Sequence, residues 1–173
     1  MFGPPGTGKS RFASCLPGIL PRMSVKEILE CSMVTSIAGK FLDGKLTKTR
    51  PFRTPHHSCS LAAMVGGGVG KKVRPGEITL AHNGVLFLDE LPEFPQHVIE
   101  SLRQPIENGE ILISRSNAHI KYPANFQLIV AMNPCKCGYL GDSYKECVKA
   151  LKCGDDYKMK ISGPILWIDL ICT

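Results

Sequence analysis

The sequence predicts an α/β fold, a mostly parallel sheet flanked by helices, from two strand-like runs with a helical pattern between them. Residues 85–88 and 126–131 are continuous apolar runs that each end in polar residues, as buried parallel strands do. Between them, Val98, Ile99 and Leu102 recur at helical spacing as an apolar stripe. Two buried strands separated by a helix indicate an α/β architecture.

Composition favours one globular domain and excludes several other classes. The chain has 173 residues, of which 43% are hydrophobic and 21% charged, so it is neither intrinsically disordered nor collagen-like. No run approaches the roughly 20 apolar residues that span a bilayer, and the start lacks the features of a signal peptide. We therefore expect a cytoplasmic protein without a membrane partner, whose eight cysteines are reduced thiols or metal ligands. The net charge of +6 permits an anionic partner such as nucleic acid.

Two helices are expected before residue 40. The first begins at Lys9 and stops before Pro17 and Gly18, because both residues break helices. The second follows the capping-box pattern Ser-Val-Lys-Glu of residues 24–27 and ends near Gly39. The apolar residues expected on one side of this helix are Val25, Ile28, Leu29 and Met33.

The middle of the chain predicts an irregular segment, a helix and a hairpin. Residues 41–77 show little periodicity and are interpreted as a long irregular insert. A helix is expected from Pro95, because proline suits the first helical position. Residues 110–114 and 118–122 predict two short strands joined by a polar turn, which is a β-hairpin.

A glycine-rich loop near the start carries the clearest chemical signal. Residues 3–10 fit the P-loop pattern G-x-x-x-x-G-K-S at every fixed position. In that pattern, glycines let backbone N–H groups point at phosphate oxygens, the lysine neutralises the β and γ phosphates, and the serine hydroxyl binds Mg²⁺. The expected nucleotide-binding residues are Gly3, Pro4, Pro5, Gly6, Thr7, Gly8, Lys9 and Ser10, of which Lys9 is also catalytic and Ser10 a magnesium ligand. The alternative is a Gly/Pro-rich turn that contains a lysine.

Polar residues at the ends of the two strand-like runs extend this signal. Asp89 and Glu90 follow residues 85–88, and Asn133 follows residues 126–131. Because α/β sheets place ligands at the carboxyl ends of their strands, Asp89 is expected to hold Mg²⁺ and Glu90 to polarise an attacking water. Asn133 is expected to hydrogen-bond that water or the γ-phosphate. The plainer alternatives are two solvated acids that cap a strand, and an asparagine that forms a turn before Pro134.

With these motifs in order, the sequence resembles the magnesium chelatase-like group of AAA+ ATPases, on the ComM-like branch. The segments that carry the resemblance span nearly the whole chain: residues 3–10, 50–57 (RPFRTPHH), 75–84 (PGEITLAHNG), 85–94 (VLFLDELPEF), 113–115 (ISR) and 133–138 (NPCKCG). The resemblance implies an ATPase core that uses ATP and Mg²⁺ and works as a homo-oligomeric, hexameric ring. It also implies that ComM-like members are motors that act on DNA.

The resemblance assigns roles to individual segments of one partial AAA+ domain, residues 1–173. Residues 3–10 become Walker A, residues 85–90 Walker B, Asn133 sensor 1, and residues 110–122 a hairpin insert that faces the pore of the ring. The candidate DNA-phosphate contacts on that hairpin are Arg115, His119 and Lys121. Their alternative interpretation is a solvated hairpin tip.

A cysteine-rich loop, residues 135–153, follows the sensor position. It contains Cys135, Cys137, Cys147 and Cys153. Four cysteine thiolates form a tetrahedral ligand set typical of structural zinc, so these residues are candidate Zn²⁺ ligands. The alternative is four reduced thiols in a loop.

Three departures from the family pattern suggest an ATPase core that is impaired in hydrolysis when alone. Only Met1 and Phe2 precede Gly3, so we expect the family's first, central strand to be missing. Trp167 stands where the family has Asp-Arg, the arginine of which reaches the neighbouring subunit's γ-phosphate, and the sequence stops at Thr173, before the helical lid. The alternatives are a non-catalytic nucleotide-binding or zinc-stabilised fragment that complements another subunit, and a magnesium chelatase ATPase subunit.

Overall fold

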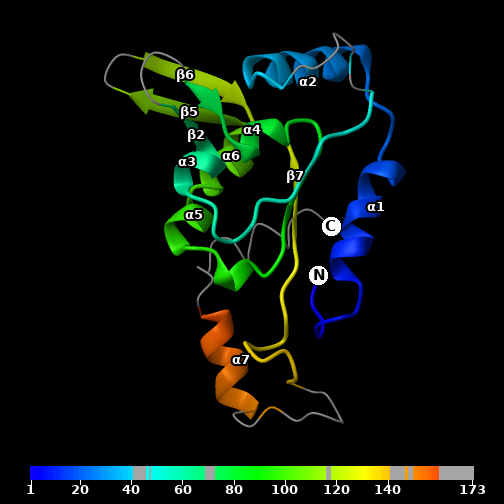
Figure 1. Ribbon diagram of the computed structural model, residues 1–173, viewed down its shortest axis with the longest axis vertical. Helices are drawn as coiled ribbons and strands as arrows, with labels where there is room; N and C mark the ends of the chain where they lie inside the picture. Colours follow the sequence, from blue (N-terminus) through cyan, green and yellow to red (C-terminus); the bar gives the residue numbers. More distant parts are fainter. Residues whose placement is uncertain are drawn as a thin grey trace.

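The computed structural model describes residues 1–40, 46, 48–68, 73–115, 118–140, 147 and 150–159, and a parallel sheet lies at its centre (Figure 1). The strand order in this sheet is β1 (Phe52–Arg53), β4 (Val85–Leu88) and β7 (Gln127–Val130). All four residues of β4 are buried, because helix α1 (Lys9–Ile19) covers one face of this strand and the main core covers the other. The two strands expected from the apolar runs are therefore confirmed as adjacent parallel strands, although β7 is only half-buried.

The first residues of the chain pair with the end of β7, on the edge opposite β4. Phe2 forms a parallel bridge with Met132, and the Met1 nitrogen donates a hydrogen bond of 2.7 Å to the Val130 carbonyl. The Met132 N–H donates back to the Met1 carbonyl at 3.0 Å. This short pairing brings the glycine-rich loop directly beside the carboxyl end of β7.

Helix α1 (Lys9–Ile19) follows the glycine-rich loop and covers one face of the sheet, where Ala13 packs with Phe87 of β4. The expected stop before Pro17 is wrong, because the helix continues to Ile19. A proline in a helix lacks the N–H that would bond the carbonyl four residues earlier, and its ring crowds that carbonyl, but only two residues of α1 follow Pro17. The Leu20 N–H still bonds the Leu16 carbonyl at 3.2 Å and closes the last turn.

Helix α2 (Val25–Ile37) begins with the expected capping box, in which Ser24 and Glu27 each accept a hydrogen bond from the other's backbone N–H. The apolar residues expected on one side of this helix are mostly exposed. Val25, Leu29 and Met33 are exposed, whereas Cys31 and Val34 are buried. Ile28, the fourth of the expected residues, is half-buried.

The segment expected to be irregular contains several short elements. They are β1, α3 (Leu61–Val65), the antiparallel pair β2 (Gly66–Gly67) and β3 (Arg74–Pro75), and the start of α4 (Glu77–Leu80). Strand β1 is anchored where the Val85 N–H donates to the Pro51 carbonyl at 2.8 Å. A Cβ atom on Gly84 would lie only 2.1 Å from that carbonyl oxygen, so this close pairing requires glycine.

The helix expected from Pro95 is split into two. A 3₁₀ turn, η1 (Leu91–Glu93), precedes α5 (Gln96–Glu100) and α6 (Arg103–Asn108), and Pro95 caps α5 rather than starting it. Pro105 has no N–H to bond the carbonyl four residues earlier, which explains the break at residues 101–102. The expected apolar stripe does face the core, where Val98, Ile99 and Leu102 are fully buried.

The expected hairpin is confirmed as β5 (Glu110–Arg115) and β6 (Ala118–Pro123), and it lies near α2 at one end of the molecule (Figure 1). Its inward face joins the main core with the helices on the second face of the sheet. The helix α7 (Ala150–Lys158) lies at the opposite end and was not foreseen (Figure 1). None of the described helices is long and apolar enough to cross a membrane.

Candidate nucleotide-binding site

The glycine-rich loop closes tightly because two of its glycines adopt left-handed backbone conformations. Gly6 has φ 83° and Gly8 has φ 78°, a region that disfavours residues with a Cβ atom. Gly8 is also the N-cap of α1, and its carbonyl accepts the Phe12 N–H at 2.9 Å. The loop therefore ends at a helix N-terminus, where partial positive charge favours anions.

Lys9 joins this loop to the end of β7. Its ammonium group donates to the carbonyls of Gly3 at 2.7 Å and Pro4 at 2.9 Å, and to Oδ1 of Asn133 at 3.1 Å. The charge thus sits inside the loop, beside the amide expected to act as sensor. The structure brings these two expected site residues together.

Ser10 and Asp89 also meet. The Ser10 hydroxyl donates a hydrogen bond of 2.5 Å to Oδ2 of Asp89, while Oδ1 of Asp89 accepts the Glu90 N–H at 3.0 Å. A hydroxyl and a carboxylate are oxygen ligands of the type that Mg²⁺ prefers. The donor set therefore fits the expected magnesium site.

Glu90 has a backbone conformation that is unusual for glutamate, with φ 55° and ψ 49°. Such left-handed residues persist where the surroundings enforce them, often at functional sites. The Oε2 atom of Glu90 lies 3.8 Å from Nδ1 of His57, and the His57 ring makes an edge contact with Phe94. Single-residue patterns in the sequence could not reveal His57, because its approach to Glu90 depends on how β1 pairs with β4.

These groups line one pocket of about 360 Å³. Its lining residues are Pro5, Gly6, Thr7, Gly8, Lys9, Ser10, Arg11, Asp89, Glu90 and Asn133. A second pocket of about 550 Å³ shares Ser10, Asp89 and Glu90 and is otherwise lined mainly by residues of the segment after β1, including His56 and His57. The expected residues Asp89, Glu90 and Asn133 therefore line the same pocket as residues 5–10 of the glycine-rich loop, whereas Gly3 and Pro4 are not among its lining residues.

Two arginines of the RPFRTPHH segment are structural anchors away from this pocket. Arg50 donates to Oε1 of Glu27 at 2.9 Å and to the Asn83 carbonyl at 2.7 Å. Arg53 forms a paired contact with Glu77 at 2.6 and 2.8 Å. Hydrogen bonds from the Ser24 backbone and from Arg50 lower the pKa of Glu27 to about 2.

The hairpin residues expected to contact DNA lie away from the pocket. His119 is exposed and its Nδ1 lies 3.1 Å from the Ser114 hydroxyl, while the Lys121 ammonium donates to Glu110 at 2.7 Å. The side chain of Arg115 and the turn at residues 116–117 are outside the described residues. Trp167 lies outside them as well.

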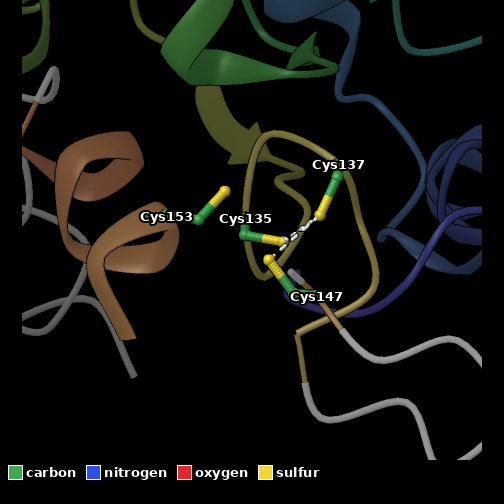
Figure 2. A group of neighbouring side chains, drawn as sticks. All are labelled: Cys135, Cys137, Cys147 and Cys153. Carbon is green, nitrogen blue, oxygen red and sulfur yellow. Dashed lines mark hydrogen bonds between the residues drawn. The ribbon is translucent and has the colours of Figure 1, made fainter. Parts of the chain in front are cut away.

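The four cysteines of the cysteine-rich loop gather at one place, as expected (Figure 2). Their Sγ atoms all lie within 4.8 Å of one another, with Cys135 to Cys137 at 3.1 Å and Cys137 to Cys147 at 3.3 Å. Burial raises the pKa of Cys135, but hydrogen bonds from Cys137 and the backbone of Leu140 and Gly138 outweigh it and lower the pKa to about 6. The ligand type and number are those of a structural zinc site.

Comparison with known proteins decides the family. The family described as "Magnesium chelatase, subunit ChlI" matches residues 1–172. The chain belongs to this family. Within the family, the ComM-like branch is supported by 52% identity over 166 residues to the competence protein ComM of Haemophilus influenzae. The uncharacterised protein YifB of Escherichia coli is 49% identical over 168 residues.

These relatives are longer than the chain. The matched regions cover 95% and 96% of this chain but 32% of ComM and of YifB, so the chain spans about a third of their length. The magnesium-chelatase 38 kDa subunit of Acidiphilium rubrum is more distant, with 27% identity over 77% of this chain and 44% of that protein.

A solved structure shows the same fold. It describes the complex between subunits BchI and BchD of magnesium chelatase, with a TM-score of 0.60 and 24% identity, and it covers 88% of this chain and 50% of that chain. The α/β fold of this family member, with its parallel sheet and helices, is therefore shared with that magnesium chelatase structure.

Helix α7 contributes a residue near the site that the sequence did not reveal. Tyr157 is 3% exposed, and burial, together with the nearby charges of Glu93 and Glu90, raises its pKa to about 12. Its hydroxyl therefore stays protonated at neutral pH, beside the acidic end of β4.

Proposed function

We propose that this chain is the ATP-binding core of a ComM-like AAA+ protein and that its pocket binds ATP together with Mg²⁺. The observation that carries this proposal is the meeting of Lys9, Ser10, Asp89 and Asn133 around one pocket, from three separate parts of the chain. Bound there, Mg²⁺ would supply positive charge that offsets the charge of the phosphates.

The chain's own groups divide the work in this proposal. The loop amides and Lys9 hold the phosphates, and Ser10 and Asp89 hold the metal. Glu90 orients and polarises the attacking water, and Asn133 contacts that water or the γ-phosphate. The Ser10–Asp89 hydrogen bond supports the fit, because it places the two oxygen ligands next to each other.

Nucleotide binding tests the proposal directly. Calorimetric titration with ATP and Mg²⁺ should show binding that Lys9→Ala weakens by about tenfold or more, because hydrogen bonds to charged groups contribute about 1.5–3 kcal/mol. Lys26→Ala is the matched control, since Lys26 lies on the exposed side of α2 with its side chain 86% exposed. Equal affinities for the wild type and Lys9→Ala would contradict the proposal.

We also propose that the isolated chain hydrolyses ATP slowly, because Trp167 stands where the family has Asp-Arg. Arginine fingers raise turnover by roughly 10³ to 10⁵ in related NTPases. A phosphate-release assay should give near-background rates, and replacing Trp167 by Asp-Arg should raise them only under conditions where the chain assembles. Brisk turnover of the unaltered chain, abolished by Glu90→Gln, would contradict this part of the proposal. The alternative of a non-catalytic subunit predicts that Glu90→Gln changes nothing beyond binding.

DNA is the partner that we propose for the ring-forming protein, with the β5–β6 hairpin as the contact. The exposed His119 and Lys121 on one hairpin face support this, although the Glu110 carboxylate offsets part of the Lys121 charge. Fluorescence anisotropy over a salt series should show that Lys121→Ala weakens DNA binding and makes it less salt-dependent. Arg103→Ala is the control, because Arg103 is similarly exposed and paired with Glu107 on α6. Equal effects of the two changes on DNA binding would contradict the assignment of the hairpin as the DNA contact.

A further inference from the structure

The cysteine cluster has the dimensions of a metal site rather than of a disulfide. The Sγ atoms of Cys135, Cys137, Cys147 and Cys153 lie within 4.8 Å of one another, and Figure 2 shows the side chains converging from the loop after β7 and from α7. A tetrahedron of sulfurs around zinc has edges of about 3.8 Å, given Zn–S bonds of about 2.3 Å. The closest Sγ pair, at 3.1 Å, is well beyond the roughly 2.05 Å of a disulfide bond.

The loop that carries two of these thiols also touches the nucleotide pocket. We call residues 134–140, at the start of the longer cysteine-rich loop, the cysteine loop. Cys135 stands two positions after Asn133, and its carbonyl accepts the Gly138 N–H at 3.0 Å, which closes a tight turn. At that turn the backbone meets the glycine-rich loop, since a Cβ atom on Gly138 would lie 2.7 Å from Cδ of Pro5. The cysteine loop thus follows one residue of the pocket, Asn133, in the sequence and packs against another, Pro5.

Helix α7 holds the same loop from the other side. Cys153 of α7 supplies the fourth thiol, and the next residue, Gly154, packs closely on the loop. A Cβ atom on Gly154 would lie 2.7 Å from Leu140 and 3.4 Å from the Pro134 carbonyl. The cysteine loop is therefore enclosed between α7 and the glycine-rich loop.

We propose that the four cysteines bind one structural Zn²⁺, and that this zinc holds the cysteine loop so that Asn133 and Pro5 are positioned for the nucleotide. Zinc content therefore controls the affinity for ATP, although the metal does not touch the nucleotide. This inference rests on the proposed ATP binding. The physical reason is that ligand positions set by a metal are fixed without a large apolar core, and small displacements of binding groups weaken binding strongly.

Metal content tests the site itself. The full chain, purified after growth with added zinc, should contain one zinc ion per chain by mass spectrometry of the metal, and Co²⁺ substitution should give the absorption bands of tetrahedral thiolate coordination. Cys137→Ser and Cys153→Ser should lose most of the zinc. Cys15→Ser is the matched control, because Cys15 is an exposed thiol on α1 outside the cluster. A wild type that takes up no zinc overturns the inference.

ATP affinity tests the coupling. Cys137→Ser should bind ATP about tenfold more weakly than the wild type, which is the scale of loss expected from misplaced binding groups, whereas Cys15→Ser should match the wild type. Cys137→His should recover both zinc and affinity, because histidine is also a zinc ligand and Cys137 is exposed. If the serine variant does not fold, stripping zinc from the wild type with a chelator and restoring it should lower and then recover ATP affinity.

The outcomes separate the two proposals. A zinc-loaded wild type that binds ATP, with affinity unchanged when zinc is removed, overturns the coupling and leaves the proposed function standing. A zinc-loaded wild type that does not bind ATP overturns both the proposed function and the coupling. Its zinc content would still support the proposal that the four cysteines bind zinc.

Discussion

The ammonium group of Lys9 lies 3.1 Å from Oδ1 of Asn133, although 124 positions separate the two residues. The contact exists because Phe2 pairs with Met132 and so places the start of the glycine-rich loop beside the end of β7. One short parallel bridge therefore aligns the expected phosphate-binding lysine with the expected sensor residue.

Asn133 should distinguish ATP from ADP. If its amide contacts the γ-phosphate, Asn133→Ala should weaken ATP binding by about tenfold, as expected for a hydrogen bond to a charged group, while ADP affinity stays nearly the same. Calorimetric titrations with both nucleotides measure this difference. Asn108→Ala, at the exposed end of α6, should change neither affinity, and an equal loss for ATP and ADP would exclude a γ-phosphate contact.

Gly138 offers a test of the contact with Pro5. Gly138→Ala should destabilise the fold by about 1–2 kcal/mol through its left-handed backbone and should also lower ATP affinity, because the new methyl group would press on Pro5. Gly109→Ala is the matched control: Gly109 has φ 67° but no atom within 4 Å of the Cβ position. Chemical unfolding should show that both variants are destabilised, Gly138→Ala more than Gly109→Ala, and ATP titration should show a binding defect only for Gly138→Ala. A binding defect of equal size in both would refute a specific role for the contact.

The left-handed backbone of Glu90 should lower the free energy of unfolding of the protein. Glu90→Gly should raise the free energy of unfolding by up to about 1 kcal/mol, because glycine relieves the left-handed strain but loses more entropy on folding. Glu90→Gln keeps the strained backbone and should give no such gain. Urea unfolding of the two variants measures the difference, and a Glu90→Gly protein less stable than the wild type would contradict the prediction.

Glu27 should make stability depend on acidic pH. Its pKa is about 2 in the folded protein against an ordinary value of 4.5, so between these values the unfolded chain binds the proton more tightly. Stability from Glu27 is therefore complete above pH 4.5 and is lost as the pH falls toward 2. Thermal unfolding from pH 6 to pH 2 should show a steeper decline for the wild type than for Glu27→Gln. Parallel curves would show that the folded-state hydrogen bonds of Glu27 contribute nothing.

Local patterns predicted the local features of this fold well. The capping box at Ser24 and Glu27 involves residues three positions apart, and the hairpin joins strands that are close in sequence. The polar ends of β4 and β7 followed from the rule that parallel strands gather their carboxyl ends at one edge. These predictions needed only information carried within short stretches of sequence.

Features that depend on distant pairing could not be predicted. Strand β1 has two residues, and it forms because Pro51 meets Gly84 across the chain. The approach of His57 to Glu90 depends on that pairing. The periodicity in α2 identified an apolar side but not what that side packs against: Leu29 and Met33 face solvent, while Cys31 is buried.

The pairing of Met1 with Val130 has a practical meaning for protein engineering. A peptide fused ahead of Met1 would begin next to β7, which is the last strand on that side of the described sheet. We expect a fused segment of β-branched residues to pair with this edge of β7. A proline-rich spacer should leave the edge unpaired, since proline has no N–H to donate to the neighbouring strand. The composition of a tag at this position should therefore be chosen with the unpaired groups of this strand in mind.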